Sequence, residues 1–356
     1  MNCIKPKVLL KRSLLFLLIL LAILFGVVLP VISVSVYRHF LNVCFITEPH
    51  HMCSVDDFEG LSVENVTFPA KQGHLLAGYK YSMEHPDPPR GVVVFAHGLF
   101  SGGQNRYMPI LAYFAAQGFE VFAYDATGND ASGGLVGGVP RGVMDLDYAI
   151  RYVKQDADYA GLPICLFGYS WGAYSVANVL NFHQDIKAIA VFAGFDKPSE
   201  LVHHMGYQEA GNWINLALPY VTIYEHLLFG EYAGATALDG FAAAEKTEVM
   251  IVHSTDDPVV PFRYGYERFH AAHSDDPRFR FVCFEDRGHD YLMFSEDAIR
   301  YQHEAYSEYD AYLAEHDLAN NSESRAAYRR EFIDDGLFFA LNDTVMSEVV
   351  SMFCAE

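Results

Sequence analysis

Residues 168–172 read Gly-Tyr-Ser-Trp-Gly, and their spacing is typical of a nucleophilic serine. An apolar, strand-like run precedes this G-x-S-x-G pattern and a helical run follows it. At such a strand-to-helix turn the glycines permit a sharp bend, which exposes the serine hydroxyl. The alternative is a tight turn whose serine has no catalytic role. The strand and helix predicted on either side favour Ser170 as a nucleophile.

A serine hydroxyl needs a base to remove its proton and a carboxylate to orient that base. In a strand–helix architecture these partners follow the serine in the order acid, then histidine. His289 lies in a glycine-containing loop after the last predicted strand and is the candidate base. Asp257 is the candidate acid, because the Pro-Val-Val-Pro segment after it would fix its loop. Asp256 and Asp196 are the alternative acids.

Acyl transfer also needs two backbone N–H groups that stabilise a developing oxyanion. We expect one from Trp171, directly after the serine, and the other from Leu99 in a glycine-rich loop. The alternative for that loop is an ordinary strand–helix turn. The loop also contains His97, which we expect to fix the loop rather than to carry protons. We expect three aromatic side chains to line the substrate pocket: Phe100, Tyr169 and Trp213.

These side chains can meet only if strands and helices alternate. Buried strands are predicted from short apolar runs at residues 91–96, 120–124, 163–168, 187–192, 248–253 and 279–284. Residues 61–68 and 75–82 read as an antiparallel pair that precedes them. Apolar strands that alternate with helices predict an α/β fold, in which a parallel sheet has helices on both faces.

The alternation is interrupted at residues 195–247, within a domain that we assign to residues 61–300. Aromatic and aliphatic residues there predict inserted helices, either as a cap over the site or as simple packing on the core. Residues 301–356 are helical and charged, and we predict a C-terminal helical extension.

The amino terminus differs in kind from the rest of the chain. Residues 1–12 form a basic flank, and residues 13–36 are uncharged and apolar over more than the roughly 20 residues that cross a bilayer. A cleaved signal peptide would have an apolar region of about 7–15 residues. We therefore predict a transmembrane signal anchor with the lipid bilayer as a partner. The basic flank should be cytoplasmic, so residues 37–60 form a juxtamembrane linker to an extracytoplasmic domain.

The composition narrows the function classes. The chain has 356 residues, of which 51% are hydrophobic, and its net charge of −21 comes from 45 acidic and 24 basic residues. Such a charge argues against a nucleic-acid partner. The six cysteines include no C-x-x-C pair, so we expect no metal site. Outside the cell, Cys44 and Cys53 could form a disulfide.

The chain resembles the α/β-hydrolase superfamily, in particular its monoacylglycerol-lipase-like and serine-aminopeptidase-like branch. The resemblance covers about residues 62–300. It rests on His97-Gly98-Leu99, Asp125 to Gly134, Gly168 to Gly172, Asp257 to Pro261 and Gly288-His289. It implies a mostly parallel eight-stranded sheet, hydrolysis through an acyl-enzyme and no cofactor. The family usually has D-x-R-G where this chain has Asp125-Ala126-Thr127-Gly128, so the anchoring of that loop stays open.

We therefore expect a membrane-anchored serine hydrolase that acts on a small-molecule acyl substrate. The aromatic insertion favours an apolar acyl group, so a carboxylic ester is the first expectation. An amide, or a peptide with a free amino terminus, is the second, because no cluster of acidic residues marks an amine pocket. A hydrolase fold without catalysis, used as an extracellular binding module, is the third.

Overall fold

The computed structural model describes residues 6–100, 102–316 and 318–355. One eight-stranded sheet crosses the domain in the order β1-β2-β4-β3-β5-β6-β7-β8. The strands β1 (Ser62–Pro69) and β2 (Leu75–Ser82) form an antiparallel pair, and β2 is also antiparallel to β4. The other neighbours are parallel. The predicted sheet, mostly parallel with an antiparallel entry pair, is confirmed.

The six parallel strands carry the apolar runs of the sequence. They are β3 (Val92–Ala96), β4 (Glu120–Tyr124), β5 (Ile164–Tyr169), β6 (Ala188–Phe192), β7 (Glu248–Ser254) and β8 (Phe279–Phe284). Every side chain of β3 and β6 is buried. Helices cover both faces of the sheet, so neither face of these central strands meets water.

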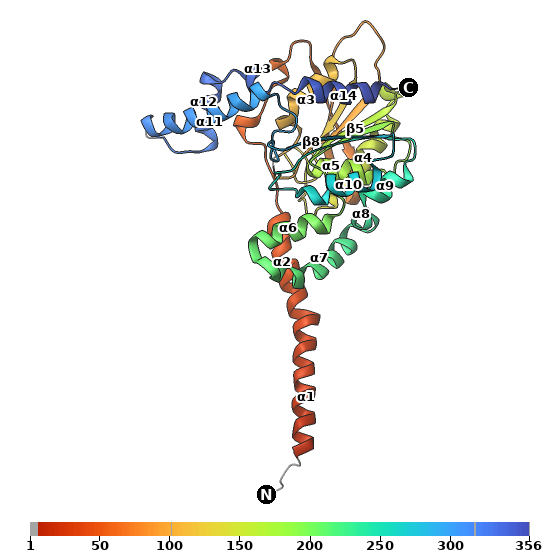
Figure 1. The fold of residues 1–356 in the computed structure, drawn as a ribbon, viewed down its shortest axis with the longest axis vertical. Coiled ribbons are helices and arrows are strands. Elements are labelled where there is room, and N and C mark those ends of the chain that lie inside the picture. The colour runs from red at the N-terminus through yellow and green to blue at the C-terminus, as the bar shows by residue number, and fades with distance from the viewer. Residues whose placement is uncertain (1–5, 101, 317, 356) are drawn as a thin grey trace.

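Two helical layers cover the sheet (Figure 1). The helices of one layer are α4 (Arg141–Gln155), α5 (Trp171–Val179), α9 (Ala237–Ala243) and α10 (Tyr266–His273). The helices of the other are α3 (Met108–Ala116) and α14 (Asp343–Cys354). Single 3-10 turns lie between elements: η3 (Val55–Asp57), η4 (Lys71–Gly73), η5 (Gln104–Tyr107), η6 (Ala157–Tyr159) and η8 (Phe262–Tyr264).

The predicted C-terminal extension has two different parts. The last helix, α14, buries Val345, Met346 and Phe353 against the sheet, and the Phe353 ring stacks on Phe114. The three helices before α14 project to one side of the sheet in Figure 1. They are α11 (Glu296–His316), α12 (Ser322–Phe332) and α13 (Asp335–Phe338). The final helix of the chain is thus part of the main core.

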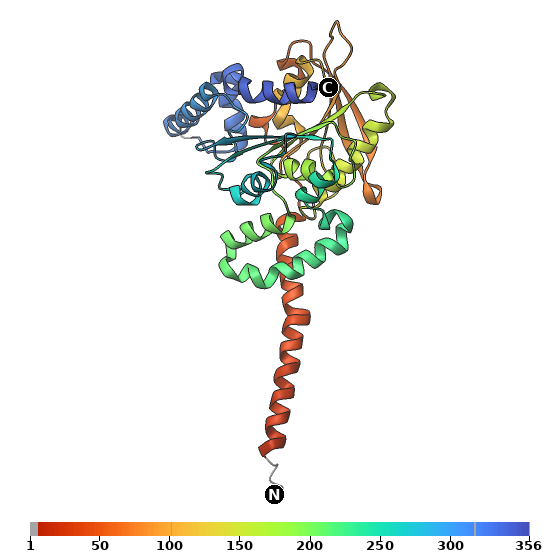
Figure 2. The same cartoon turned by 45° about the vertical axis from the view of Figure 1, so that its right-hand side comes forward.

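The insertion between β6 and β7 is helical, as predicted. It contains α6 (Pro198–Ala210), η7 (Gly211–Trp213), α7 (Ile214–Phe229) and α8 (Glu231–Gly234). We call α6, η7 and α7 the cap. Figures 1 and 2 show the cap below the sheet, alongside the upper end of the long N-terminal helix.

The N-terminal helix consists of α1 (Pro6–Ile23), a π-helical turn η1 (Leu24–Val28) and α2 (Leu29–Leu41). Its stretch Lys11–Leu41 is long and apolar enough to be a membrane anchor or a signal sequence. Residues 1–5 of the predicted basic flank lie outside the described residues. The helix stands away from the domain except at α2, which packs along α7 (Figure 2), and at η1, where the Phe25 carbonyl accepts a hydrogen bond from Tyr220 of α7.

The predicted linker of residues 37–60 is packed against the domain. Phe45 pairs with Asn129 in the loop after β4, and the turn η2 (Pro49–His51) rests on α12. The expected disulfide is wrong, because both cysteines are free thiols in different surroundings. Cys44 is exposed beside Gly134, whereas Cys53 is buried next to α12.

Candidate active site

Ser170 occupies the turn between β5 and α5. Its φ of +56° lies in the left-handed region, which residues other than glycine seldom adopt. The backbone on either side is crowded, because a Cβ on Gly172 would overlap the carbonyl of Ala96. The Ser170 N–H donates to the Phe192 carbonyl at 2.7 Å, which ties the turn to β6. The sharp turn therefore depends on the glycines of the G-x-S-x-G pattern.

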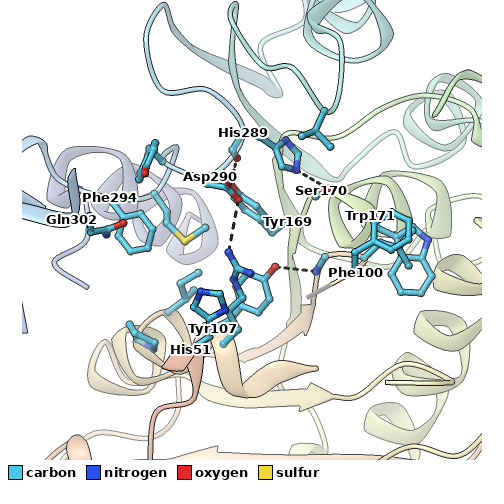
Figure 3. A pocket seen from close by; sticks show the side chains of 18 of the residues that line it. His51, Phe100, Tyr107, Tyr169, Ser170, Trp171, His289, Asp290, Phe294 and Gln302 are labelled. Atoms are coloured by element: carbon cyan, nitrogen blue, oxygen red, sulfur yellow. Dashed lines mark hydrogen bonds and ion pairs between the residues drawn. The ribbon is translucent and has the colours of Figure 1, made fainter. Parts of the chain in front are cut away.

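The structure brings Ser170, His289 and Asp257 into one hydrogen-bonded series. His289 Nε2 lies 3.0 Å from Ser170 Oγ (Figure 3), and His289 Nδ1 lies 2.7 Å from Asp257 Oδ2. The other oxygen, Asp257 Oδ1, accepts the N–H groups of Val259 and Val260, both at 2.8 Å. The Pro-Val-Val-Pro segment thus folds back onto the carboxylate and fixes its orientation.

The Asp257 carboxyl group is buried but remains ionised. Burial alone would raise its pKa, but hydrogen bonds with His253 and His289 hold the pKa well below its usual range. An anion at this position favours the His289 tautomer that carries its proton on Nδ1. That tautomer leaves the Nε2 lone pair directed at the Ser170 hydroxyl.

The two alternative acids face other groups. The Asp256 carboxylate accepts hydrogen bonds from Ser254 Oγ and from the Gly288 N–H, so it caps the loop that carries His289. Asp196 pairs with Arg268 Nη1 at 2.9 Å. Neither carboxylate contacts His289 in the structure.

Two loops meet beside Ser170, where an oxyanion would form. Trp171 is the first residue of α5, and N–H groups in the first turn of a helix have no partner within that helix. Leu99 follows β3 and lines the same cavity as Trp171. Both residues predicted to supply these N–H groups therefore line the cavity at Ser170.

The loop after β3 is fixed from behind by His97. Its Nε2 accepts the Ala126 N–H at 2.9 Å, so its Nδ1 donates to the Gly98 carbonyl at 2.7 Å. Burial lowers the pKa of His97 to about 4, and the ring is neutral at physiological pH. His97 thus holds two loops together, the role expected for it from the sequence.

The loop after β4 is anchored without the arginine that the family usually has. The Asp125 carboxylate accepts the Gln104 N–H at 3.0 Å and the Tyr79 hydroxyl at 2.7 Å, and burial raises its pKa to about 6. Asp130 accepts the Gly103 N–H at 2.9 Å and the Thr47 N–H at 2.6 Å. Aspartates therefore hold this loop, and one of them ties it to the N-terminal segment.

A cavity of about 640 Å³ opens at Ser170 and His289 (Figure 3). Phe100 and Tyr169 line it, as the sequence predicted. The expectation for Trp213 is wrong. This side chain is 75% exposed and is not part of the cavity lining, because the η7 turn directs it outward.

Several lining residues could not be identified from the sequence. His51 comes from the N-terminal segment, Arg106 from η5, Tyr306 from α11 and Phe338 from α13. For Tyr306 and Phe338, the only sequence signal was an aromatic residue within a charged region. Arg106 lies 3.8 Å from Asp290, which also lines the cavity. Within the part of the chain that the structure describes, no group of three or more His, Cys, Asp or Glu residues could hold a metal ion.

Comparisons with known proteins agree with this architecture. The profile of the family described as Serine aminopeptidase, S33 matches residues 87–231. The uncharacterized protein YfhR of Escherichia coli K12 is 23% identical over 233 residues, which cover 64% of this chain and 74% of YfhR. Dipeptidyl-peptidase 5 of Schizosaccharomyces pombe is 24% identical over 271 residues, which cover 69% of this chain but 37% of that protein.

A solved structure shows the same fold. The Pyrococcus furiosus esterase Pf2001 superposes with a TM-score of 0.54 at 15% identity, over 77% of this chain and 97% of the esterase. The sheet, the helical layers and the matched profile lead to one assignment. This chain has an α/β-hydrolase fold, and its residues 87–231 are similar to the family of serine aminopeptidases.

Proposed function

We propose that this protein is a membrane-anchored serine hydrolase that cleaves carboxylic esters through an acyl-enzyme. The observation that carries the proposal is the series Ser170–His289–Asp257, with hydrogen-bond distances of 3.0 and 2.7 Å. A nucleophile within hydrogen-bond reach of a base, which is itself oriented by an acid, is the arrangement that nucleophilic catalysis requires.

In the proposed reaction, Ser170 Oγ attacks the acyl carbonyl while His289 Nε2 removes the hydroxyl proton. The N–H groups of Leu99 and Trp171 stabilise the oxyanion. His289 then gives its proton to the leaving alcohol, and the acyl group stays on Ser170. Water, activated by the same imidazole, attacks the acyl-enzyme and releases the acid. Throughout, Asp257 orients His289 and stabilises its charged form.

The cavity lining supports an apolar acyl group. Leu201, Met205, Val259, Met293 and Phe294 all contribute to it. An aminopeptidase would need a free carboxylate that binds the substrate ammonium group. The lining carboxylate Asp290 lies next to the Arg106 guanidinium, which offsets its charge. An ester is therefore the first candidate.

A peptide or amide is the second candidate. The matched family is described as serine aminopeptidases, and one relative is named a dipeptidyl-peptidase. The same three side chains would serve amide hydrolysis, with an amine in place of the alcohol as the leaving group.

The membrane anchoring is supported by the way the N-terminal helix meets the domain. Tyr37 and Leu41 at its end are buried, and the Tyr37 hydroxyl hydrogen-bonds Glu225 of the cap. Cleavage of a signal peptide after Phe25 would remove the carbonyl that accepts the Tyr220 hydroxyl of α7, and cleavage within α2 would remove residues that pack on α7. We therefore propose that the helix is retained. The basic residues Lys11 and Arg12 would keep its start in the cytoplasm and the catalytic domain on the extracytoplasmic side.

The test uses the full chain in detergent with a fluorophosphonate probe, which labels activated serines. We expect labelling of the wild type, and no labelling of Ser170→Ala at an unchanged unfolding temperature. A folded wild type that resists the probe would contradict the enzyme proposal and favour a non-catalytic binding module. Rates on p-nitrophenyl esters of increasing chain length, compared with aminoacyl anilides, test the substrate. Faster cleavage of the anilides would reverse the order of the two candidates.

A further inference from the structure

One face of the cap is exposed and apolar. Trp213 is 75% exposed and Leu227 is 83% exposed, and Leu216 and Ile223 between them are exposed as well. No charged residue occurs from Ile214 to Tyr224, although the chain has a net charge of −21. A continuous apolar surface of this kind marks an interaction site. We call Trp213, Leu216, Ile223 and Leu227 the apolar cap face.

The cap is joined to the N-terminal helix deep within its apolar run. The Tyr220 hydroxyl of α7 donates to the Phe25 carbonyl at 2.8 Å. Phe25 lies in the π-helical turn, where the Leu29 N–H bonds to the Leu24 carbonyl. The next residue, Pro30, has no N–H, so the Phe25 carbonyl lacks its helical donor. Such a carbonyl costs several kcal/mol in a bilayer unless another group satisfies it, and Tyr220 does so.

A second contact fixes α7 nearer the domain. The Tyr37 hydroxyl hydrogen-bonds the buried Glu225 of α7, and the Val139 N–H donates to Tyr37 at 3.2 Å. Phe25 and Tyr37 are about 18 Å apart along a helix that rises 1.5 Å per residue. Contacts at both levels determine how α7 lies along the helix (Figure 1).

These contacts set the depth of the cap. A span of about 20 residues that begins after Arg12 ends near Ile32. Phe25 then lies about 10 Å below the outer edge of the apolar layer, at 1.5 Å per residue. Amphipathic helices at a membrane surface bury their apolar face by about 5–10 Å. The Tyr220 contact therefore places α7 at the depth of an interfacial helix.

We infer that the apolar cap face is embedded in the lipid monolayer on the domain side of the bilayer. This inference rests on the proposed membrane anchoring. Phospholipid acyl chains cover the apolar cap face, because this face is continuous with the apolar N-terminal helix, which itself needs a lipid environment. Trp213, which has an apolar body and a polar N–H, has the side-chain type that is enriched at membrane–water interfaces.

The embedded face has a consequence for the substrate. The cap also lines the catalytic cavity, through Leu201 and Met205 of α6. The cap therefore lies between the bilayer and Ser170. An ester dissolved in the membrane reaches the cavity past the cap without crossing bulk water.

Tryptophan fluorescence tests the inference, because the chain has two tryptophans and one of them, Trp171, is buried. The full chain is reconstituted into phosphatidylcholine vesicles, with and without phosphatidylcholine brominated on its acyl chains. We expect brominated lipid to quench at least half of the Trp213 emission and aqueous iodide to quench little of it. The Trp213→Phe variant should show little of either response, since the remaining tryptophan, Trp171, is only 1% exposed.

The outcomes separate the two proposals. Protein that fails to float with the vesicles contradicts the membrane anchoring itself. Protein that floats while iodide, and not bromine, quenches Trp213 overturns the embedded face but leaves the anchoring intact. Protection from both quenchers would indicate a second copy on this face and would also overturn the inference.

A substitution tests the consequence for activity. Leu227→Glu introduces a charge on the apolar cap face at a position with few contacts, so folding should be unaffected. We expect at least a tenfold lower rate on a long-chain ester incorporated in vesicles and an unchanged rate on a soluble short-chain p-nitrophenyl ester. The matched control is Leu318→Glu, an exposed leucine far from the cap. Equal losses in the two variants, or equal losses on the two esters, would overturn the inference.

Discussion

Replacement of Asp257 by asparagine is the sharpest test of the proposed catalytic series. Asparagine has the same shape, so its side-chain oxygen can still accept the Val259 and Val260 N–H groups. The group 2.7 Å from His289 Nδ1 would then be an amide without charge. An amide N–H at that place would also favour the tautomer with its proton on Nε2, which cannot accept the Ser170 proton.

The magnitude follows from the charge that develops on His289. In the transition state the imidazolium and the carboxylate form an ion pair, and two unit charges about 4 Å apart are worth about 4 kcal/mol at an effective dielectric constant near 20. Each 1.4 kcal/mol changes a rate about tenfold, so the lost charge alone accounts for roughly 10³-fold. With the wrong tautomer added, we expect kcat/KM to fall by about 10³- to 10⁴-fold.

The assay is hydrolysis of a short-chain p-nitrophenyl ester, alongside the unfolding temperature of each variant. Asp256→Asn is the matched control, because this neighbour caps Ser254 and Gly288 rather than His289. We expect it to retain activity within about tenfold, since the amide oxygen can still accept the Gly288 N–H. If Asp256→Asn lost as much activity as Asp257→Asn, or more, the assignment of the acid would be refuted.

Three further predictions concern stability. His97 is held neutral with a folded pKa of about 4, below the unfolded value of about 6.5. Above about pH 6.5 the contribution of neutral His97 to the free energy of unfolding is complete. This free energy falls by about 3 kcal/mol as the pH is lowered from 6.5 to 4. His97→Gln should flatten this pH dependence in urea unfolding. Tyr37→Phe leaves the buried Glu225 carboxyl with one donor fewer, at a cost of about 1–3 kcal/mol, and should speed hydrogen exchange in α7. Met346→Ala opens a cavity between α14 and the sheet and should cost about 2–5 kcal/mol in urea unfolding, whereas the exposed Leu318→Ala should cost under about 0.5.

Much of the architecture followed from local patterns. Continuous apolar runs broken by helical ones predicted the parallel sheet, because strands buried on both faces need apolar residues at every position. The glycines around Ser170 predicted a sharp turn, since a crowded backbone leaves no room for a side chain. The placement of His289 near Ser170 could also be predicted, because His289 follows the last strand and parallel strands end at the same edge of the sheet.

Other features depend on contacts between distant segments, which local patterns do not encode. Asp256 and Asp257 follow the same strand, and only the folded loop directs one carboxylate to Gly288 and the other to His289. Trp213 is an aromatic residue of the insertion and was therefore expected in the pocket, but in the η7 turn its side chain is exposed and outside the cavity lining. Likewise, His51 of the N-terminal segment and Phe338 of α13 line the cavity only because these distant segments pack together in the folded chain.

By itself, the sequence determined the order of strands and helices, the chemical types at each strand end and the presence of a long apolar helix. These properties depend on periodicity and on backbone conformation, which neighbouring residues set. The tertiary structure decided which helix completes the core and what the apolar helix touches. Phe25 and Tyr220 are 195 residues apart, and their contact exists only because the cap folds back along the helix.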